Sequence, residues 1–104
     1  MYGTVAHLHV KPGMEETLAK QIRDFEAAQV PGAIAVYVYQ MDADPHDYYM
    51  AVVWESKESY LANATSMEQH ARYQEFRQAL VGESEWHDGE IVHVSIRERA
   101  RTTA

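Results

Sequence analysis

The chain has 104 residues, of which 46% are hydrophobic and 24% charged, so its size and composition fit one domain built around a single core. It contains no cysteine, which excludes disulfides and thiolate chemistry and leaves His, Asp and Glu as metal ligands. The absence of cysteine also fits a reducing cytoplasm, where we expect the protein. The formal net charge of -7 disfavours a nucleic-acid partner, and no apolar run approaches the roughly 18 residues of a membrane span, so no membrane partner is expected.

Four segments are predicted to be strands, three because apolar residues recur in them at every second position and the third in chain order because it is a continuous apolar run typical of a buried strand. They comprise residues 2–10, 33–41, 48–54 and 90–98. The second and third are joined by the short, turn-rich sequence DADPHD, which predicts an antiparallel hairpin. The fourth follows the stretch GESEWHDG, which is predicted to be a loop.

Three further segments have the spacing or the start signals of helices. The first follows a Pro-Gly pair, and its apolar side chains recur at helical spacing on one face: Met14, Leu18, Ile22 and Phe25. Ser56 is placed to cap a short second helix that carries Tyr60. Ser66 begins a longer third helix with a capping-box pattern, and this helix should turn His70 and Tyr73 inward.

This order of elements predicts an α+β fold, the ferredoxin-like split βαβ arrangement, in which a four-stranded antiparallel sheet has helices on one face. Residues 1–98 should form this one domain, and residues 99–104 a flexible C-terminal tail. On strands one, two and four, the face away from the helices should carry amphipathic side chains: His7, His9, Tyr37, Tyr39, His93 and Ser95. Such a face is too apolar to remain wet, so we expect a homodimer that encloses a cavity between two sheets.

Several short motifs stand at particular places relative to the predicted strands and helices. They are VKPG before the first helix, PG before the second strand, WES at residues 54–56, a tyrosine six residues after that tryptophan, a histidine early in the last helix, and EWHDGEIVHVSI near the end. With them the chain resembles the antibiotic biosynthesis monooxygenase family of dimeric α/β-barrel proteins. The resemblance implies oxidation of a quinol- or anthrone-type phenolic molecule by dioxygen, without metal, flavin or haem, so no cofactor is expected.

The resemblance also implies roles for particular residues. Trp54 and Tyr60 match pocket residues of the polyketide-tailoring members, and Met50 stands where those members have an asparagine. We expect a planar phenolic molecule to stack against Trp54 and Tyr60, while a histidine or tyrosine, with His70 as the candidate, accepts its proton. The predicted catalytic residues are therefore His70, Trp54 and Tyr60. The predicted substrate-binding residues are His7, His9, Tyr37, Tyr39, Met50, Tyr73 and His93.

Two alternatives remain open from the residues alone. Trp54 can be read as a packing anchor and His70 as a structural histidine, in which case the protein is a non-catalytic, small-molecule-binding dimer. In the other alternative, His7, His9 and His93 converge from the neighbouring first and last strands and hold zinc, iron or nickel for a metal-dependent enzyme.

Overall fold

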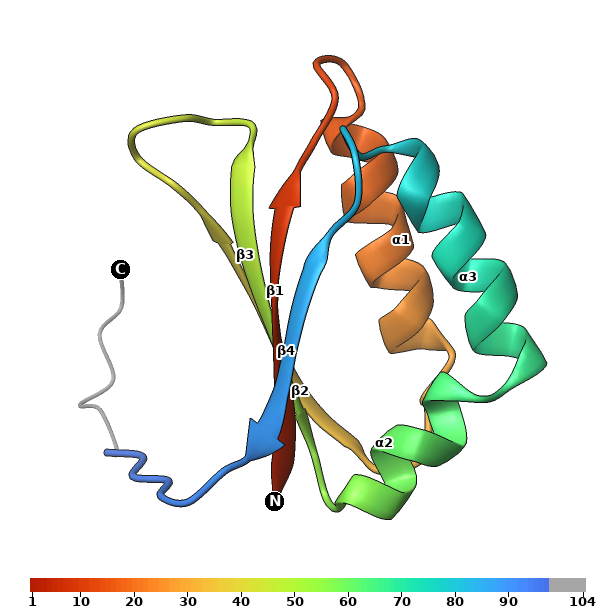
Figure 1. Cartoon of the computed structure of the whole chain (residues 1–104), viewed down its shortest axis with the longest axis vertical. Helices are drawn as coiled ribbons and strands as arrows, with labels where there is room; N and C mark the ends of the chain where they lie inside the picture. Colours follow the sequence, from red (N-terminus) through yellow and green to blue (C-terminus); the bar gives the residue numbers. More distant parts are fainter. Residues whose placement is uncertain (98–104) are drawn as a thin grey trace, which may run out of the picture.

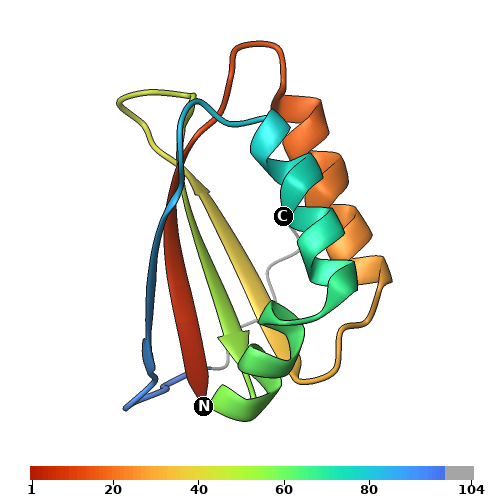
Figure 2. The same cartoon turned by 45° about the vertical axis from the view of Figure 1, so that its right-hand side comes forward.

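Four antiparallel strands form one sheet, and three helices cover one of its faces, in a computed structural model that describes residues 1–97 (Figures 1 and 2). The elements in chain order are β1 (Tyr2–His9), α1 (Glu15–Ala27), β2 (Ala33–Gln40), β3 (Asp47–Trp54), α2 (Lys57–Ala64), α3 (Met67–Gln78) and β4 (Glu85–Glu90). The strand order is β2-β3-β1-β4, and every neighbouring pair is antiparallel. The predicted ferredoxin-like α+β fold is confirmed. The predicted tail, residues 99–104, lies outside the described residues.

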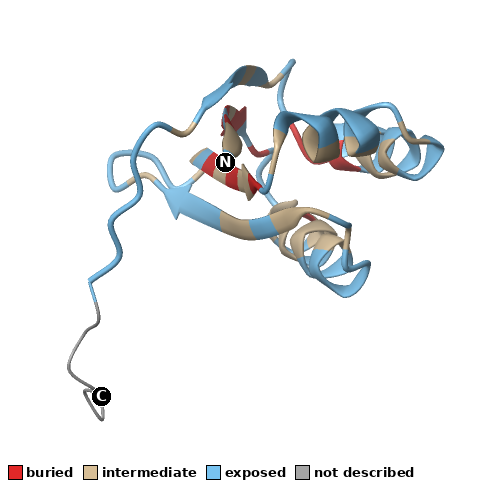
Figure 3. Ribbon diagram, turned by 90° about the horizontal axis from the view of Figure 1, so that it is seen from below, coloured by how far each residue is buried: buried red, intermediate tan, exposed pale blue. Residues whose placement is uncertain are grey.

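The core lies between the helices and the sheet face that they cover, which we call the inner face. Alternate residues of β1 point into it, as predicted, and they are almost fully buried, as is the inner row of β3. In Figure 3 the buried segments of the strands and helices face one another, and the outer sides of the helices are exposed. The buried hydrophobic residues are Ala6, Leu8, Val10, Leu18, Met50, Val52, Trp54, Phe76, Ala79 and Leu80. Within residues 1–97, none of the helices combines the length and apolar character of a membrane span.

The two predicted serine caps begin the helices that follow β3. The Ser56 hydroxyl accepts the Ser59 amide at 3.1 Å, and the Ser59 hydroxyl accepts the Ser56 amide at 3.2 Å, which completes a capping box for α2. Ser66 begins α3 by accepting the Gln69 amide at 3.1 Å. The turn before β2 packs against α2 so closely that a Cβ atom on Gly32 would overlap the Ser59 side chain, and Gly32 also has a positive φ of 85°.

The fourth strand does not lie where the sequence pattern predicts it. It runs from Glu85 to Glu90, so all but its last residue fall within the predicted loop, whereas residues 91–97 have no regular secondary structure. The reason is the short connection from α3, which is tied to the end of β1 by the bond from the Val81 amide to the His9 carbonyl at 2.7 Å. This bond brings the chain beside β1 early, so the ladder forms with residues 85–90. Val92 is consequently 92% exposed, and His93 is not in the sheet.

A second difference concerns the start of β2. The pairing with β3 shifts between Ala33 and Ala35, so Ile34 is the extra residue of a bulge and is 52% exposed. Strict alternation, with Tyr37 and Tyr39 on the face away from the helices, would place Ile34, Val36 and Val38 beneath the helices. Ala33 packs against the core in place of Ile34. Val36 also packs against the core, as the alternation predicts.

Candidate active site

A cavity of about 280 Å³ lies between the inner face of the sheet and the helices. This volume is near the lower end of the range for small-molecule sites, roughly 300–1,000 Å³. Its walls are predominantly apolar, with an unusual share of aromatic rings: Phe25, Trp54, Tyr60, Tyr73, Phe76 and Trp86. Such walls favour a flat, largely apolar ligand that can contact several ring faces or edges.

Trp54 ends β3 and is the most deeply buried of these rings, at 3% exposure. Its ring meets Phe25 edge-on at a centroid distance of 6.3 Å and Tyr60 edge-on at 5.8 Å, so packing fixes its orientation. Its Nε1–H is buried and has no hydrogen-bond partner anywhere in residues 1–97. An unsatisfied buried donor costs about 1–3 kcal/mol. Neighbouring side chains cover this atom, so a ligand oxygen in the cavity can accept from it only after they move.

Tyr60 lies on α2, and the pKa of its hydroxyl is strongly raised. Burial, followed by the interaction with the Asp88 carboxylate, raises the pKa of Tyr60 from 10.0 to about 12. Asp88 lies on β4 opposite Thr4 and accepts the Thr4 hydroxyl hydrogen at 2.6 Å, an interaction that links this carboxylate to the buried centre of the sheet. Tyr60 therefore keeps its proton at neutral pH and acts as a hydrogen-bond donor, not as a base.

Polar side chains from α2 and α3 form another part of the cavity wall. Arg72 donates from Nη2 to the Asn63 side-chain oxygen at 3.1 Å and from Nε to the Gln69 side-chain oxygen at 3.2 Å. Its guanidinium also lies 5.8 Å from the Phe25 ring centroid. Both hydrogen bonds go to neutral oxygens and so leave the positive charge uncompensated, which suits an anionic ligand group such as a phenolate.

His70 is exposed on α3, although it belongs to the residues that line the cavity. Its Nε2 lies 3.1 Å from the Gln74 side-chain nitrogen, so one ring nitrogen is positioned by the next turn of the helix. An exposed imidazole at the edge of an apolar cavity can exchange protons with water and with a ligand. The structure thus makes His70 accessible, whereas the sequence pattern predicts it on the inward side of the helix.

The predicted site residues divide between two places. Trp54, Tyr60, His70, Met50 and Tyr73 all line the inner cavity. The other predicted residues do not line that cavity. The opposite face of the sheet, which we call the outer face, carries His7 and His9 of β1 and Tyr37 and Tyr39 of β2. His93 follows β4. The cavity predicted between two sheets requires a second copy of the chain and stays a prediction, whereas the cavity observed in the single chain lies beneath the helices.

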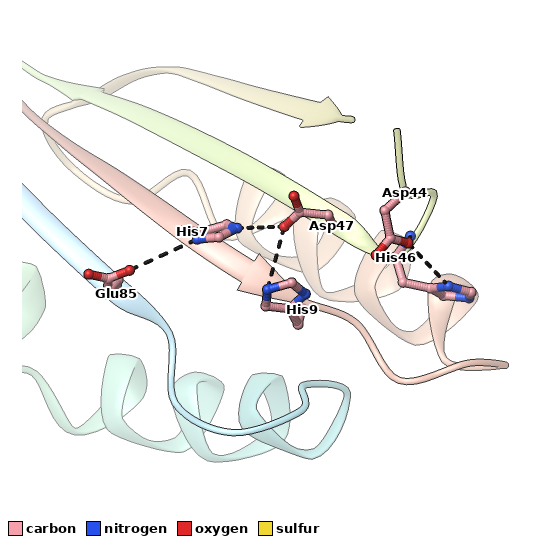
Figure 4. Close-up of polar contacts among 6 residues, drawn as sticks. All are labelled: His7, His9, Asp44, His46, Asp47 and Glu85. Carbon is pink, nitrogen blue, oxygen red and sulfur yellow. Dashed lines mark hydrogen bonds and ion pairs between the residues drawn. The ribbon is translucent and has the colours of Figure 1, made fainter. Parts of the chain in front are cut away.

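The predicted cluster of His7, His9 and His93 is wrong in one member. Among residues 1–97, the close group of potential metal ligands is His7, His9 and Asp47 (Figure 4). His93 is absent from this group because the fourth strand ends before it. Asp47 has no motif signal of its own. Its proximity depends on the β1–β3 register, in which it pairs with His9.

Two comparisons place the chain among known proteins. The family model for antibiotic biosynthesis monooxygenases matches residues 1–80. SnoaB, a cofactor-independent oxygenase from Streptomyces nogalater, is 14% identical with a TM-score of 0.77, over 89% of this chain and 94% of that chain. A conserved protein from Methanosarcina mazei Go1 is 21% identical with a TM-score of 0.73, over 85% of this chain and 89% of that one.

These two structural similarities show the shared fold alone, because both identities are low. The search of curated proteins finds no match. The family model covers most of the chain, including β1, both β-strands of the hairpin and all three helices. The resemblance carried by the sequence motifs is thereby confirmed, and the chain belongs to the antibiotic biosynthesis monooxygenase family.

Proposed function

We propose that the protein is a cofactor-independent monooxygenase that binds a planar phenolic molecule of the quinol or anthrone type in the inner cavity and oxidises it with dioxygen. The observation that carries the proposal is a cavity walled by six aromatic rings, one of which, Trp54, has a buried Nε1–H without a partner among residues 1–97. A ligand with one oxygen at that donor and a flat hydrocarbon body satisfies both features. The family supports monooxygenase chemistry of this general type.

The proposed chemistry needs one proton transfer and little else from the protein. His70 accepts a proton from the bound phenol or its activated CH2 group, and the resulting electron-rich anion is held near the charge of Arg72. The anion gives its electrons to dioxygen and forms a carbon–oxygen bond. Loss of water then leaves a carbonyl, so that CH2 and O2 become C=O and H2O.

Tyr60 and Trp54 have a positioning role in this scheme. The raised pKa of Tyr60 keeps its hydroxyl protonated, so in the proposed complex a ligand oxygen replaces Asp88 as the acceptor of this hydrogen, and the Trp54 N–H is a second donor once the side chains that cover it move. Donors that point at a developing oxyanion in an apolar cavity stabilise it more strongly than water does. The cavity also keeps bulk water from the anion before it meets dioxygen.

We also propose that two copies associate through the outer face. Its large side chains are substantially exposed in the single chain: Val5, Tyr37, Tyr39 and Tyr49. Val92 and Ile96, which follow β4, are exposed as well. A second copy of the same surface would cover these groups with closed two-fold symmetry, which is the commonest form of homo-oligomer.

The function is tested by oxygen uptake with a panel of quinols and anthrones. The native protein should consume oxygen above the uncatalysed rate, and a chelator should leave that rate unchanged. Trp54→Phe should bind the ligand more weakly and turn over more slowly, because it keeps the ring and removes the N–H. Leu61→Ala, at an exposed position on α2 that does not line the cavity, is the control and should match the native rate.

Binding and turnover are separated by measuring ligand affinity under anaerobic conditions. Saturable binding without oxygen uptake would replace the proposed enzyme by a small-molecule-binding protein. An unchanged rate in a folded Trp54→Phe protein would show that the tryptophan N–H does not contact the substrate.

A further inference from the structure

The outer face contains a cluster of side chains that the proposed oxidation does not use. His7 and His9 come from the end of β1, and Asp47 is the first residue of β3 (Figure 4). In the β1–β3 ladder His9 pairs directly with Asp47, and His7 pairs with Tyr49. The three side chains thus share one end of the outer face and are held by paired backbone, which gives them a fixed spacing.

The geometry points to a divalent transition-metal site formed by His7, His9 and Asp47. One ligand atom from each residue lies within 4.8 Å of the others. The Nε2 atoms of His7 and His9 lie 2.5 Å and 3.7 Å from the same Asp47 oxygen, Oδ1. Tetrahedral ligands with bonds of about 2.0–2.1 Å are roughly 3.3–3.4 Å apart. The two observed separations lie on either side of that value and differ from it by less than 1 Å.

The His7 ring is oriented by groups outside the cluster. It stacks on the Tyr49 ring, with centroids 4.4 Å apart and planes inclined by 3°. Its second nitrogen, Nδ1, lies 3.9 Å from a carboxylate oxygen of Glu85 on β4. Without an ion, Nε2 donates its hydrogen to Asp47, and an ion that replaces this hydrogen needs the ring proton on Nδ1, where the Glu85 carboxylate can stabilise it.

The chemistry of the three donors defines the class of ion. Two neutral imidazoles and one carboxylate suit zinc, ferrous iron and their first-row neighbours, and they are too few in oxygen atoms for calcium. The side chains of His7 and Asp47 are 27% and 23% exposed, and that of His9 is 52% exposed, so water can fill the remaining coordination positions. The site is on the opposite face from the inner cavity, so it is independent of the proposed oxidation.

Metal titration of the untagged, chelator-stripped protein tests this inference. Zn²⁺ followed by calorimetry should bind once per chain and raise the unfolding temperature, because an ion that binds only the folded state stabilises it. His9→Gln and Asp47→Asn should each lose this saturable binding. Glu85→Gln should weaken it by about tenfold, as removal of a group that orients a ligand typically does.

The matched control is His46→Gln. His46 lies one residue before Asp47 but pairs with Glu15 at 3.1 Å and lies outside the cluster, so its loss should leave the affinity unchanged. Circular dichroism establishes that each variant is folded. Zn²⁺ binding of equal strength in native protein, His9→Gln and Asp47→Asn would overturn the proposal, as would a stoichiometry far below one.

A second measurement requires no variant. Co²⁺ added to the native protein should develop the strong visible absorption of a four- or five-coordinate ion with nitrogen and oxygen ligands. A spectrum that stays that of the hydrated ion at saturating protein would also overturn the proposal.

Discussion

The two faces of the sheet are made by the same strands, yet they present opposite chemistry. The inner face combines aliphatic and aromatic side chains with a few buried polar groups, such as the Thr4 hydroxyl and the Trp54 N–H. The outer face carries histidines, carboxylates and exposed tyrosines. An apolar, enclosed face suits a flat organic ligand, and an exposed polar face suits an ion or another protein surface. Burial by the helices, rather than residue type alone, therefore decides which tyrosines and histidines can contact an organic ligand and which can contact an ion or another protein.

The largest effect should come from truncating the inner face. Trp54→Ala removes a ring that packs against Phe25 and Tyr60, and it should lower the free energy of unfolding by about 3–5 kcal/mol. Denaturant unfolding followed by circular dichroism measures this. Leu61→Ala, which truncates an exposed side chain on α2, is the control and should change the same quantity by less than about 0.5 kcal/mol. Equal effects would mean that Trp54 is not part of the core.

The next effect concerns how α2 is held beside the inner face. Gly32→Ala should lower the free energy of unfolding by about 1–3 kcal/mol more than Gly13→Ala does. Both glycines have a φ of 85°, but a Cβ atom at Gly32 overlaps Ser59, and one at Gly13 meets nothing within 4 Å. The matched pair therefore isolates the contact with α2 from the backbone strain. Similar losses in the two variants would show that the turn can move away from Ser59.

A smaller effect is expected on the outer face, and it should appear in association rather than in folding. Tyr37→Glu places a charge on the β2 side of that face and should weaken the proposed dimer by at least about 1.4 kcal/mol, a tenfold rise in Kd. Sedimentation over a concentration series measures it. Leu61→Glu, on the helical side, should leave the association unchanged. A native protein that is a folded monomer at high concentration would contradict the expected homodimer.

The smallest effect is a change in how steeply the free energy of unfolding falls with rising pH. The folded protein holds the Tyr60 proton more tightly than the unfolded chain, so this contribution to stability is present below about pH 10 and is lost as the pH rises toward about 12. Tyr60→Phe should flatten the fall of the unfolding free energy in that window. Asp88→Asn should lower the pKa of Tyr60, because it removes a neighbouring negative charge, and the ultraviolet absorbance of tyrosinate reports the shift. An unchanged titration in Asp88→Asn would separate Tyr60 from Asp88.

Much of the fold could be predicted from local patterns. The strand faces of β1 and the starts of α2 and α3 depend on alternation and on serine caps, which are local in sequence. The position of β4 could not be predicted, because residues 91–97 alternate as well as a strand does, and the outcome depends on the bond between Val81 and His9 across the chain. Turn-like residues such as Asp88 and Gly89 concealed the true strand.

The candidate site was predictable only in part for the same reason. Trp54, Tyr60 and His70 stand out by residue type and by their places in a motif. Asp88 and Asp47 acquire their roles from the pairings Thr4–Asp88 and His9–Asp47, which are matters of register. Alternation also assigns residues to two faces without saying where a cavity will remain, since that depends on how well the helix side chains fill the space.

Strand β1 contributes Thr4 to the inner face and His7 and His9 to the outer face, by steps of an odd number of residues. A single inserted or deleted residue between Thr4 and His7 would exchange the faces for everything beyond it, so that histidines would enter the core and Leu8 would face solvent. Divergence among related chains should therefore proceed in this strand by substitution at constant length. Substitutions can then change the ligand of one face without disturbing the other face. A one-codon insertion or deletion would instead disrupt the residue pattern of both faces at once.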